Sequence, residues 1–470
     1  MAQHHLIHSQ PFTTDVFTIP YKDGYILHIP EPGLVAGVDA HFCGIIEDLK
    51  QNRPIEDTAN NRELLTVLET LQVFAPKPVP AAEPPAEYRP TDVTLSLTSR
   101  CHLRCVYCYA RAGDKIQDMP TEIIDAALYF VADNTVWHER NSFIVGFHGE
   151  GEPTANWPLF RHAIEQAKRL ARERGLEVTF TMSSNGMWSP AQREYLADCF
   201  ANISLSFDGP SEIQDAQRPM ASGAPSFPTV FENLQFLESK GVDYGIRATV
   251  LPTGLDSMVP FLNLISEELE CNYVHFEPVF FTGRGIDHDL GVASTDAFYQ
   301  GFLDAYQKAV TRGGELGISV TYSGCRATHF STNFCGSTGP DPNFFVSTSG
   351  IVSSCFEIID PTSAKGQFTV YGRYDPGARR FVFDHEKLEQ LWRFGVDSIA
   401  HCKDCFARWN CSGDCFARSD ISLENGAIVA SQESPRCQAN RETTLQELVR
   451  RGLVMDALSR SDQVSAITDE

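Results

Sequence analysis

The chain has 470 residues, more than a single hydrophobic core usually accommodates, so more than one domain is expected. Its hydrophobic share of 42% and charged share of 21% are those of an ordinary globular protein. The formal net charge of −23 disfavours nucleic acid and anionic membranes as partners. We see neither a signal segment nor an apolar run of bilayer length, which predicts a cytoplasmic protein with no membrane partner.

Residues 1–75 form a first, small block that combines strand-like and helical patterns. Its apolar residues predict two strands followed by two helices, over 15–20, 24–29, 40–51 and 61–71. Six prolines then fall within residues 76–90, and such a stretch cannot continue a helix or a sheet ladder. We therefore predict a proline-rich linker over residues 76–91 and a domain boundary there.

From residue 92 to residue 324, β-rich runs alternate with amphipathic helical stretches. The β-rich runs are Val93–Thr98, Ser142–Phe147, Glu177–Met182, Ile203–Phe207, Tyr244–Val250 and Tyr273–Phe276. The helical stretches include Thr121–Asp133, Pro158–Arg174, Ala191–Phe200, Pro228–Lys240 and Asp256–Leu269. This alternation implies parallel βαβ units and an α/β fold. Six repeats predict a partial (β/α)6 barrel with its chemistry at the carboxyl ends of the strands.

Cysteine is the exception in an otherwise ordinary composition. Eight of the 14 cysteines fall between Cys325 and Cys437, where glycine and turn residues replace the regular pattern. Without an export signal the thiols should stay reduced, and clustered reduced thiols bind metal. We therefore predict a loop-rich domain over residues 325–440 that metal clusters stabilise, followed by a C-terminal helix and tail over 441–470.

The first predicted barrel strand runs directly into three cysteines, Cys101, Cys105 and Cys108. Thiolates at this spacing can hold an iron–sulfur cubane and leave its fourth iron without a protein ligand. An open coordination position is typical of a catalytic metal. The alternatives are a zinc site that lacks one ligand, or unpaired cysteines of the core.

At these cysteines the sequence resembles the radical S-adenosylmethionine (SAM) enzymes, whose CxxxCxxC loop follows the first barrel strand. The resemblance implies that the open iron binds the amino and carboxylate groups of S-adenosylmethionine. Its cleavage then yields a 5′-deoxyadenosyl radical that abstracts a hydrogen from the substrate. The cofactor supplies this chemistry, and the protein supplies positioning and a dry site.

Later strand ends resemble further motifs of the same family. Residues 148–154 are similar to the GGEP motif, which receives the methionine ammonium, although Glu150 stands where the family has its first glycine. Arg247 could pair with the cofactor carboxylate. The resemblance gives as cofactor-binding candidates Tyr107, Gly151, Glu152, Pro153, Ser184, Asn185, Ser206, Asp208 and Arg247, with Asp215 and Arg218 as further candidates. Taken singly, each also has an ordinary explanation as a turn or ion-pair residue.

The second cysteine group follows the pattern CX14GX4C, CX2CX5CX3C and C. A zinc ribbon is the alternative, with four or eight ligands. The pattern resembles the SPASM extension of radical SAM enzymes, which carries two auxiliary [4Fe–4S] clusters. That resemblance assigns the first to Cys325, Cys335, Cys355 and Cys415, and the second to Cys402, Cys405, Cys411 and Cys437. The expected cofactors are thus three [4Fe–4S] clusters and S-adenosylmethionine.

Enzymes with this extension modify peptides or small proteins. The N-terminal block resembles the winged-helix-like recognition domain of peptide maturases, which binds the leader of a precursor peptide by adding it to a sheet edge. A structural cap or a dimerisation arm is the alternative for this block. We therefore predict a radical SAM oxidoreductase that forms a carbon–carbon or thioether cross-link in a ribosomally made precursor, with flavodoxin or ferredoxin as electron donor.

A carboxylate near the substrate could accept the proton that is lost. Glu277 and Glu357 are the candidates, and either could instead be an ordinary ion-pair member. The alternative activity is that of an anaerobic sulfatase-maturating enzyme, which usually has aspartate where Phe356 stands and lacks a recognition domain. A non-catalytic peptide-binding protein stabilised by metal is the alternative of another class.

Overall fold

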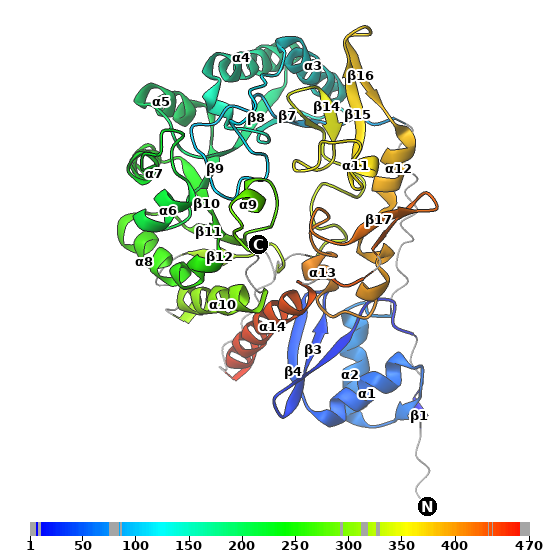
Figure 1. Ribbon diagram of the computed structural model, residues 1–470. Coiled ribbons are helices and arrows are strands. Elements are labelled where there is room, and N and C mark those ends of the chain that lie inside the picture. The colour runs from blue at the N-terminus through cyan, green and yellow to red at the C-terminus, as the bar shows by residue number, and fades with distance from the viewer. Residues whose placement is uncertain are drawn as a thin grey trace, which may run out of the picture.

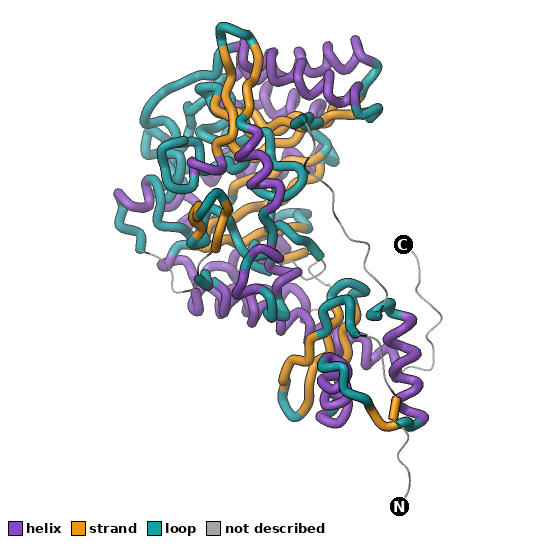
Figure 2. Tube along the Cα trace, turned by 90° about the vertical axis from the view of Figure 1, so that its right-hand side faces the viewer, coloured by secondary structure: helices purple, strands orange, loops and turns teal. Residues whose placement is uncertain are grey.

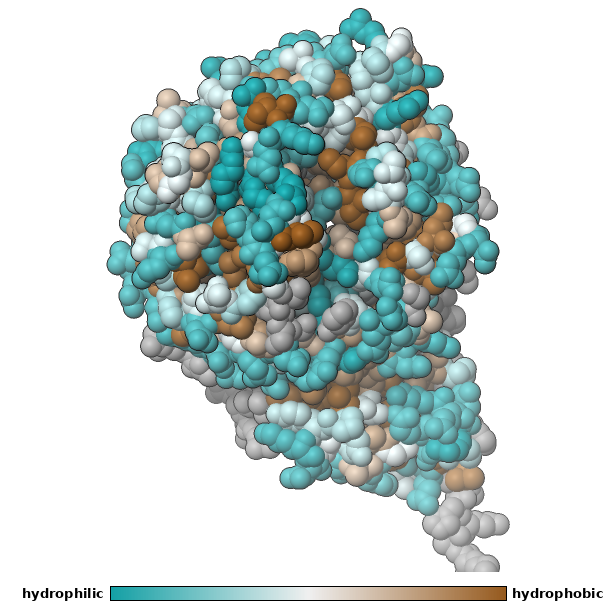
Figure 3. All heavy atoms as spheres, in the orientation of Figure 1, coloured by the Kyte–Doolittle hydropathy of each residue, from teal (hydrophilic) through white to brown (hydrophobic). Residues whose placement is uncertain are grey.

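The computed structural model describes residues 6–7, 11–74, 84, 87–291, 295–311, 318–325, 330–430, 432–434 and 436–460. Figure 1 shows a strongly curved sheet with helices along its outer side, a C-terminal part opposite the open side of that curve, and a small N-terminal domain below. Figure 2, turned by 90°, shows the N-terminal domain to one side of the rest of the chain. The space-filling view in Figure 3 shows that hydrophilic residues cover most of the face seen in Figure 1. Most of the predicted proline linker lies outside the described residues.

The curved sheet has the strand order β12-β11-β10-β9-β8-β7-β6-β13-β14-β15-β16. Its parallel strands are β6 (Asp92–Leu95), β7 (Ser142–Phe147), β8 (Glu177–Ser184), β9 (Asn202–Ser206), β10 (Asp243–Val250), β11 (Tyr273–Pro278) and β12 (Ser319–Thr321). The six predicted strands are confirmed. The pattern did not indicate β12, which has only three residues.

Helices cover the outer face of this sheet (Figure 1). They are α3 (Thr121–Trp137), α4 (Trp157–Arg174), α5 (Pro190–Cys199), α6 (Ser211–Gln217), α7 (Phe227–Lys240), α8 (Met258–Glu268) and α10 (Thr295–Thr311). The five predicted helices are confirmed to within four residues at each end. Local signals set some ends, such as the capping box of Ser189 and Gln192 in α5 and the left-handed Gly175 after α4.

The strands bury alternate residues against these helices. In β10, Tyr244, Ile246, Ala248 and Val250 are buried, whereas Arg247 on the opposite pleat is exposed. Register aligns Arg247 with Ser206 of β9 and with His275 of β11. A row of polar side chains therefore lines the inner face of the curve, where the carboxyl ends of the strands converge.

The sheet continues beyond the barrel into the C-terminal part. β13 (Phe345–Val346) pairs in parallel with β6, and β14 (Ile351–Ser353), β15 (Val370–Asp375) and β16 (Arg380–Phe383) follow in antiparallel order. The remaining elements there are α11 (Gly366–Thr369), α12 (His385–Arg393), α13 (Arg408–Cys411), β17 (Ile421–Glu424), β18 (Ala427–Ala430) and α14 (Cys437–Arg460). The predicted domain division at residue 325 thus does not interrupt the sheet.

The N-terminal domain has a three-stranded antiparallel sheet between two helical layers. It comprises β2 (Phe17–Tyr21), β3 (Gly24–Ile29), β4 (Leu34–Val38), α1 (Ala40–Lys50) and α2 (Ala59–Thr70), with β1 (Leu6–Ile7) paired to β5 (Ile55–Glu56). One face of the sheet packs on α1 and α2, and the other, through Ile26 and Val35, packs on Leu448 and Val449 of α14. Within the described residues, no helix is both long enough and apolar enough to cross a bilayer.

Candidate active site

Three thiols gather in the loop that follows β6. Cys108 contributes to the raised pKa of Cys101, and both of these contribute to that of Cys105, so the three thiols lie close together; none is in a disulfide. Burial raises the pKa of Cys101 to about 11 and that of Cys105 to about 12. Such buried thiols lose their protons readily only when a metal binds, so the trio fits an iron–sulfur cluster.

Glu152 is the centre of a buried hydrogen-bond network beside this loop, which we call the Glu152 network. Its Oε1 accepts hydrogen bonds from the Thr154 hydroxyl (2.7 Å) and from the Ser184 hydroxyl (2.9 Å). Its Oε2 accepts one hydrogen bond from the backbone N–H of Asn185 (2.8 Å), which leaves Oε2 with further acceptor capacity. The Asn185 side chain donates in turn to the Cys101 sulfur (3.5 Å). The ends of β7 and β8 are thereby joined to the cysteine loop.

The turn before Glu152 approaches the cysteine loop closely. A Cβ on Gly151 would stand 2.4 Å from the Thr98 carbonyl oxygen, so glycine is required there. The positive φ of this turn, 141°, belongs to Gly149, whereas Glu150 has no positive φ and tolerates a side chain. The Glu150 carboxylate accepts hydrogen bonds from the backbone N–H (2.7 Å) and hydroxyl (3.0 Å) of Thr348, between β13 and β14.

Tyr107 and Asp208 form a buried network rather than an open surface. The Tyr107 hydroxyl donates to Asp208 (2.6 Å) and accepts from Arg218 (2.6 Å). Asp208 also accepts from the Gln217 amide (2.8 Å), and its side chain is 0% exposed. In the structure this carboxylate therefore holds the cysteine loop through Tyr107. The expected contacts of Tyr107 and Asp208 with the adenosine of the cofactor stay predictions.

The other strand-end candidates lie as follows. Pro153 begins a short 3-10 turn next to Glu152, and Ser206 ends β9 at the same level as Arg247. Arg247 is exposed on the inner face, and its charge helps to lower the pKa of His148 to about 4, although burial of His148 has the larger effect. A cationic side chain at this position suits the cofactor carboxylate. Asp215 instead caps α7, because it accepts from the N–H groups of Ser226 (2.8 Å) and Phe227 (2.7 Å).

The later cysteines fall into two groups in the C-terminal part. Burial raises the pKa of Cys355 to about 11 and that of Cys415 to about 12, and the nearby Cys335 thiol adds to both shifts, so these three cysteines lie close together. The second group lines one cavity, and its members are Cys402, Cys405, Cys411 and Cys437. Both groups are free thiols. Within the described residues, no group of three or more His, Cys, Asp or Glu side chains is arranged as a site for a single metal ion. The two auxiliary clusters stay predictions.

Cys325 lies beside α14 and α10. The Thr444 hydroxyl of α14 is 3.7 Å from its sulfur, and its thiol affects the pKa of Tyr299 in α10. Residues 326–329, which lead from it towards Cys335, lie outside the described residues. Its assignment to the first auxiliary cluster stays a prediction.

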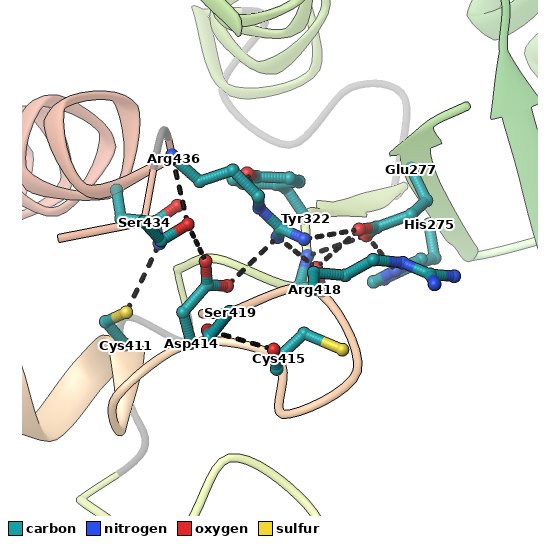
Figure 4. A network of polar contacts seen from close by, with 12 residues as sticks. His275, Glu277, Tyr322, Cys411, Asp414, Cys415, Arg418, Ser419, Ser434 and Arg436 are labelled. Carbon is teal, nitrogen blue, oxygen red and sulfur yellow. Dashed lines mark hydrogen bonds and ion pairs between the residues drawn. The ribbon is translucent and has the colours of Figure 1, made fainter. Parts of the chain in front are cut away.

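The two carboxylates considered as proton acceptors are both in ion pairs. Burial raises the pKa of Glu277, but Arg436, 3.2 Å away, and His275 outweigh burial and lower that pKa to about 2. Figure 4 shows Glu277 facing Arg436, which also faces Asp414 at 3.5 Å. Glu357 pairs with Arg418 at 2.5 Å. These contacts favour the ion-pair interpretation of both residues.

Two arginines near the site were not predicted from the sequence, because neither belongs to one of the motifs described above. Arg436 precedes Cys437 and joins β11 to the C-terminal part. Arg284 lies in α9 (Arg284–Asp287) and contacts the cysteine loop. The pair of glycines at 283 and 285, in the segment that follows the sixth predicted strand, is the signal that could have indicated a close approach there.

Three comparisons place this geometry among known proteins. Residues 95–265 match the family model described as the radical SAM superfamily. The chain is 26% identical over 195 residues to a serine-type anaerobic sulfatase-maturating enzyme of Bacteroides thetaiotaomicron, covering 41% of this chain and 46% of that protein, about half its length. It is 21% identical over 356 residues to a cysteine-type anaerobic sulfatase-maturating enzyme of Clostridium perfringens. This alignment covers 73% of this chain and 92% of that protein.

Among solved structures, the chain is similar to native anSMEcpe with bound AdoMet and Kp18Cys peptide. The TM-score is 0.59 at 17% identity, over 77% of this chain and 99% of that chain. This likeness shows a shared fold.

Proposed function

Residues 95–265 belong to the radical SAM superfamily, and from this premise we propose that the chain is a peptide maturase that cross-links a ribosomally made precursor. The match confirms the expectation of an enzyme that uses S-adenosylmethionine and a [4Fe–4S] cluster. The substrate and the bond formed are the proposal.

The observation that carries this proposal is the Glu152 network, in which the carboxylate has hydrogen-bond partners and remaining acceptor capacity. Oε1 accepts hydrogen bonds from two hydroxyl groups, and Oε2, which accepts one from the backbone N–H of Asn185, has further acceptor capacity that an ammonium group would use. Arg247 offers a cation to a carboxylate from the same inner face. Together they would orient the amino-acid end of S-adenosylmethionine above Cys101, Cys105 and Cys108. When bound, the cluster and the cofactor would supply the radical that abstracts the substrate hydrogen.

Two auxiliary clusters are the second element of the proposal. The Cys335, Cys355 and Cys415 group lies next to the barrel, since Tyr109 of the cysteine loop is near both Cys108 and Cys355. The Cys402, Cys405, Cys411 and Cys437 group lines a separate cavity. An electron that leaves the substrate would pass through these groups to an external acceptor. A flavodoxin or ferredoxin would supply the separate electron that cleaves S-adenosylmethionine.

The N-terminal domain would bind the leader at the outer edge of β4. A two-residue turn joins β2 to β3, and at this register the backbone N–H and C=O of Ile26 in β3 point towards β2. Gly37 of β4 lies opposite Ile26, so its own backbone N–H and C=O point away from β3, towards the open edge of the sheet. Gly37 is exposed, whereas the other edge strand, β2, contains Pro20 and lacks one donor. Strand addition at β4 would present the precursor to the barrel.

A sulfatase-maturating activity is the second candidate, favoured by the relatives from Bacteroides and Clostridium. Phe356 disfavours it, because its ring packs on His148 (5.3 Å between centroids) and on Phe345 (5.4 Å) and offers no proton acceptor. The N-terminal domain also has no role in that reaction.

The test is anaerobic reconstitution followed by reaction with candidate precursor peptides, chosen from short open reading frames beside the gene. Three cubanes predict about twelve irons per chain and 5′-deoxyadenosine in the products. A cross-linked peptide has lost two hydrogens, does not react with aldehyde reagents and does not fragment between the joined residues in mass spectrometry. An aldehyde-reactive product would establish the second candidate. Stoichiometric zinc without nucleoside would instead indicate a metal-stabilised binding protein.

Leader binding is tested by a matched pair of variants at Gly37. Gly37→Pro removes the outward N–H of β4, and Gly37→Ala keeps it while placing a Cβ where no atom lies within 4 Å. We expect a labelled leader peptide to lose affinity for the proline variant alone. Equal binding by both variants would place the leader elsewhere.

A further inference from the structure

The segment after β11 lies directly on the three-cysteine loop. Its short helix α9 is seen within the curve of the strands in Figure 1. Gly283, which precedes α9, has a φ of 53°, and a Cβ there would stand 2.2 Å from the Cys108 carbonyl oxygen and 2.5 Å from that of Tyr109. Only glycine permits this approach.

Arg284 follows that glycine and reaches into the loop. Its backbone N–H donates to the Cys108 carbonyl (3.0 Å), and its guanidinium donates to the carbonyls of Cys105 (3.2 Å) and Ala112 and to the Asp114 carboxylate (2.6 Å). Arg284 is only 6% exposed. One residue therefore fixes the backbone at both of the last two cysteines and at Ala112 beyond them.

The planar guanidinium is well suited to this task. Its fork serves several acceptors from one rigid group, and three acceptors offset the cost of burying the charge. A lysine ammonium at the end of a flexible chain cannot reproduce this geometry.

A second link between the same segments provides a contrast. Arg111 pairs with Asp287, and the two side chains are 44% and 47% exposed. Exposed pairs of this kind contribute little, because water competes for both charges. Arg111 therefore joins the two segments without determining the path of the loop.

Resting on the proposed function, we propose that Arg284 is a positioning residue that holds the three-cysteine loop in the conformation that receives the catalytic cluster. The loop is fixed from two sides. Asp208 holds it through Tyr107 from the end of β9, and Arg284 holds it from the end of β11. Hydrogen bonds to a charged donor are the stronger class, so removal of the guanidinium should loosen residues 105–114 more than any single neutral contact would.

The test compares Arg284→Met and Arg284→Lys with Arg111→Met in the full-length protein. Before reconstitution, we expect amide hydrogen exchange over residues 105–114 to be at least about tenfold faster in both Arg284 variants and unchanged in Arg111→Met. After reconstitution, Arg284→Met should lack about four of twelve irons. Arg284→Lys should keep its irons, yet the electron paramagnetic resonance signal of its reduced form should respond less to S-adenosylmethionine. The auxiliary signals should persist in all three proteins and show that they are folded.

Wild-type exchange, iron content and spectral response in Arg284→Met would overturn this role. Equal losses in Arg111→Met would also overturn it, since the effect would then belong to any contact between the segments. Failure of the wild-type protein to bind iron at these cysteines would refute the proposed function instead. The exchange comparison before reconstitution would still decide whether Arg284 orders the loop.

Discussion

Replacement of Glu277 by glutamine separates an ion-pair role from a proton-accepting role. Burial raises the pKa of Glu277, but Arg436 and His275 prevail and lower it from the ordinary 4.5 to about 2. This difference corresponds to about 3 kcal/mol of stabilisation at neutral pH. Because the folded pKa is the lower one, the stabilisation is complete above pH 4.5 and is lost as the pH falls towards 2.

Native-state hydrogen exchange measures this contribution locally, which suits a protein of several domains. With each 1.4 kcal/mol equal to a factor of ten, Glu277→Gln should speed exchange in β11 and at the start of α14 about a hundredfold at pH 7. The difference between variant and wild type should vanish between pH 4.5 and pH 2. Glu357→Gln is the control, since it breaks the Arg418 pair and should leave β11 protected.

Unchanged exchange in Glu277→Gln would refute the ion-pair reasoning. If that variant also formed 5′-deoxyadenosine but no modified peptide, Glu277 would be the proton acceptor instead.

Three further outcomes follow from the geometry. Glu152→Gln removes the charge that would hold the cofactor ammonium, so S-adenosylmethionine should bind about 10- to 100-fold more weakly by calorimetry, and unaltered affinity would exclude Glu152 from the site. Gly151→Ala places a Cβ 2.4 Å from the Thr98 carbonyl, so iron analysis should find only the auxiliary irons, and a full complement would contradict this. Burial lowers the pKa of His28 to about 4 from 6.5, so the N-terminal sheet should be most stable above pH 6.5 and lose up to about 3 kcal/mol as the pH falls towards 4. Circular dichroism melting at pH 5 and pH 7.5 checks this, and His28→Leu should abolish the difference; a wild-type sheet equally stable at both values would contradict it.

The sequence predicted those parts of the site that depend on local spacing. Cys101 to Cys108, Glu152 and Asn185 could be located because each follows a strand that its own apolar pattern defines, and parallel strands bring their carboxyl ends together. Partners distant in the chain could not be found in this way. The contact of Glu150 with Thr348 joins residues 198 positions apart, and nothing in either neighbourhood announces it.

Short elements escaped for a related reason. β12, β13 and β14 have two or three residues each, too few for an alternating pattern, so the extension of the sheet into the C-terminal part was not anticipated. Glu277 shows a different limit. Its position at a strand end suggested chemistry, and only the three-dimensional neighbour Arg436 reveals a charge partner.

The packing of the N-terminal sheet on α14 affects how the protein is exposed during its synthesis. Ile26 and Val35 emerge from the ribosome more than 400 residues before Leu448 and Val449, against which they pack. At about 5–20 residues per second, the span from residue 74 to residue 449 takes roughly 20–80 s. For that time the apolar face of β2, β3 and β4 has no native cover, and a chaperone or a second nascent chain could occupy it. Because α14 also begins at Cys437, a chain that stalls before this helix would lack both that cover and a candidate cluster ligand.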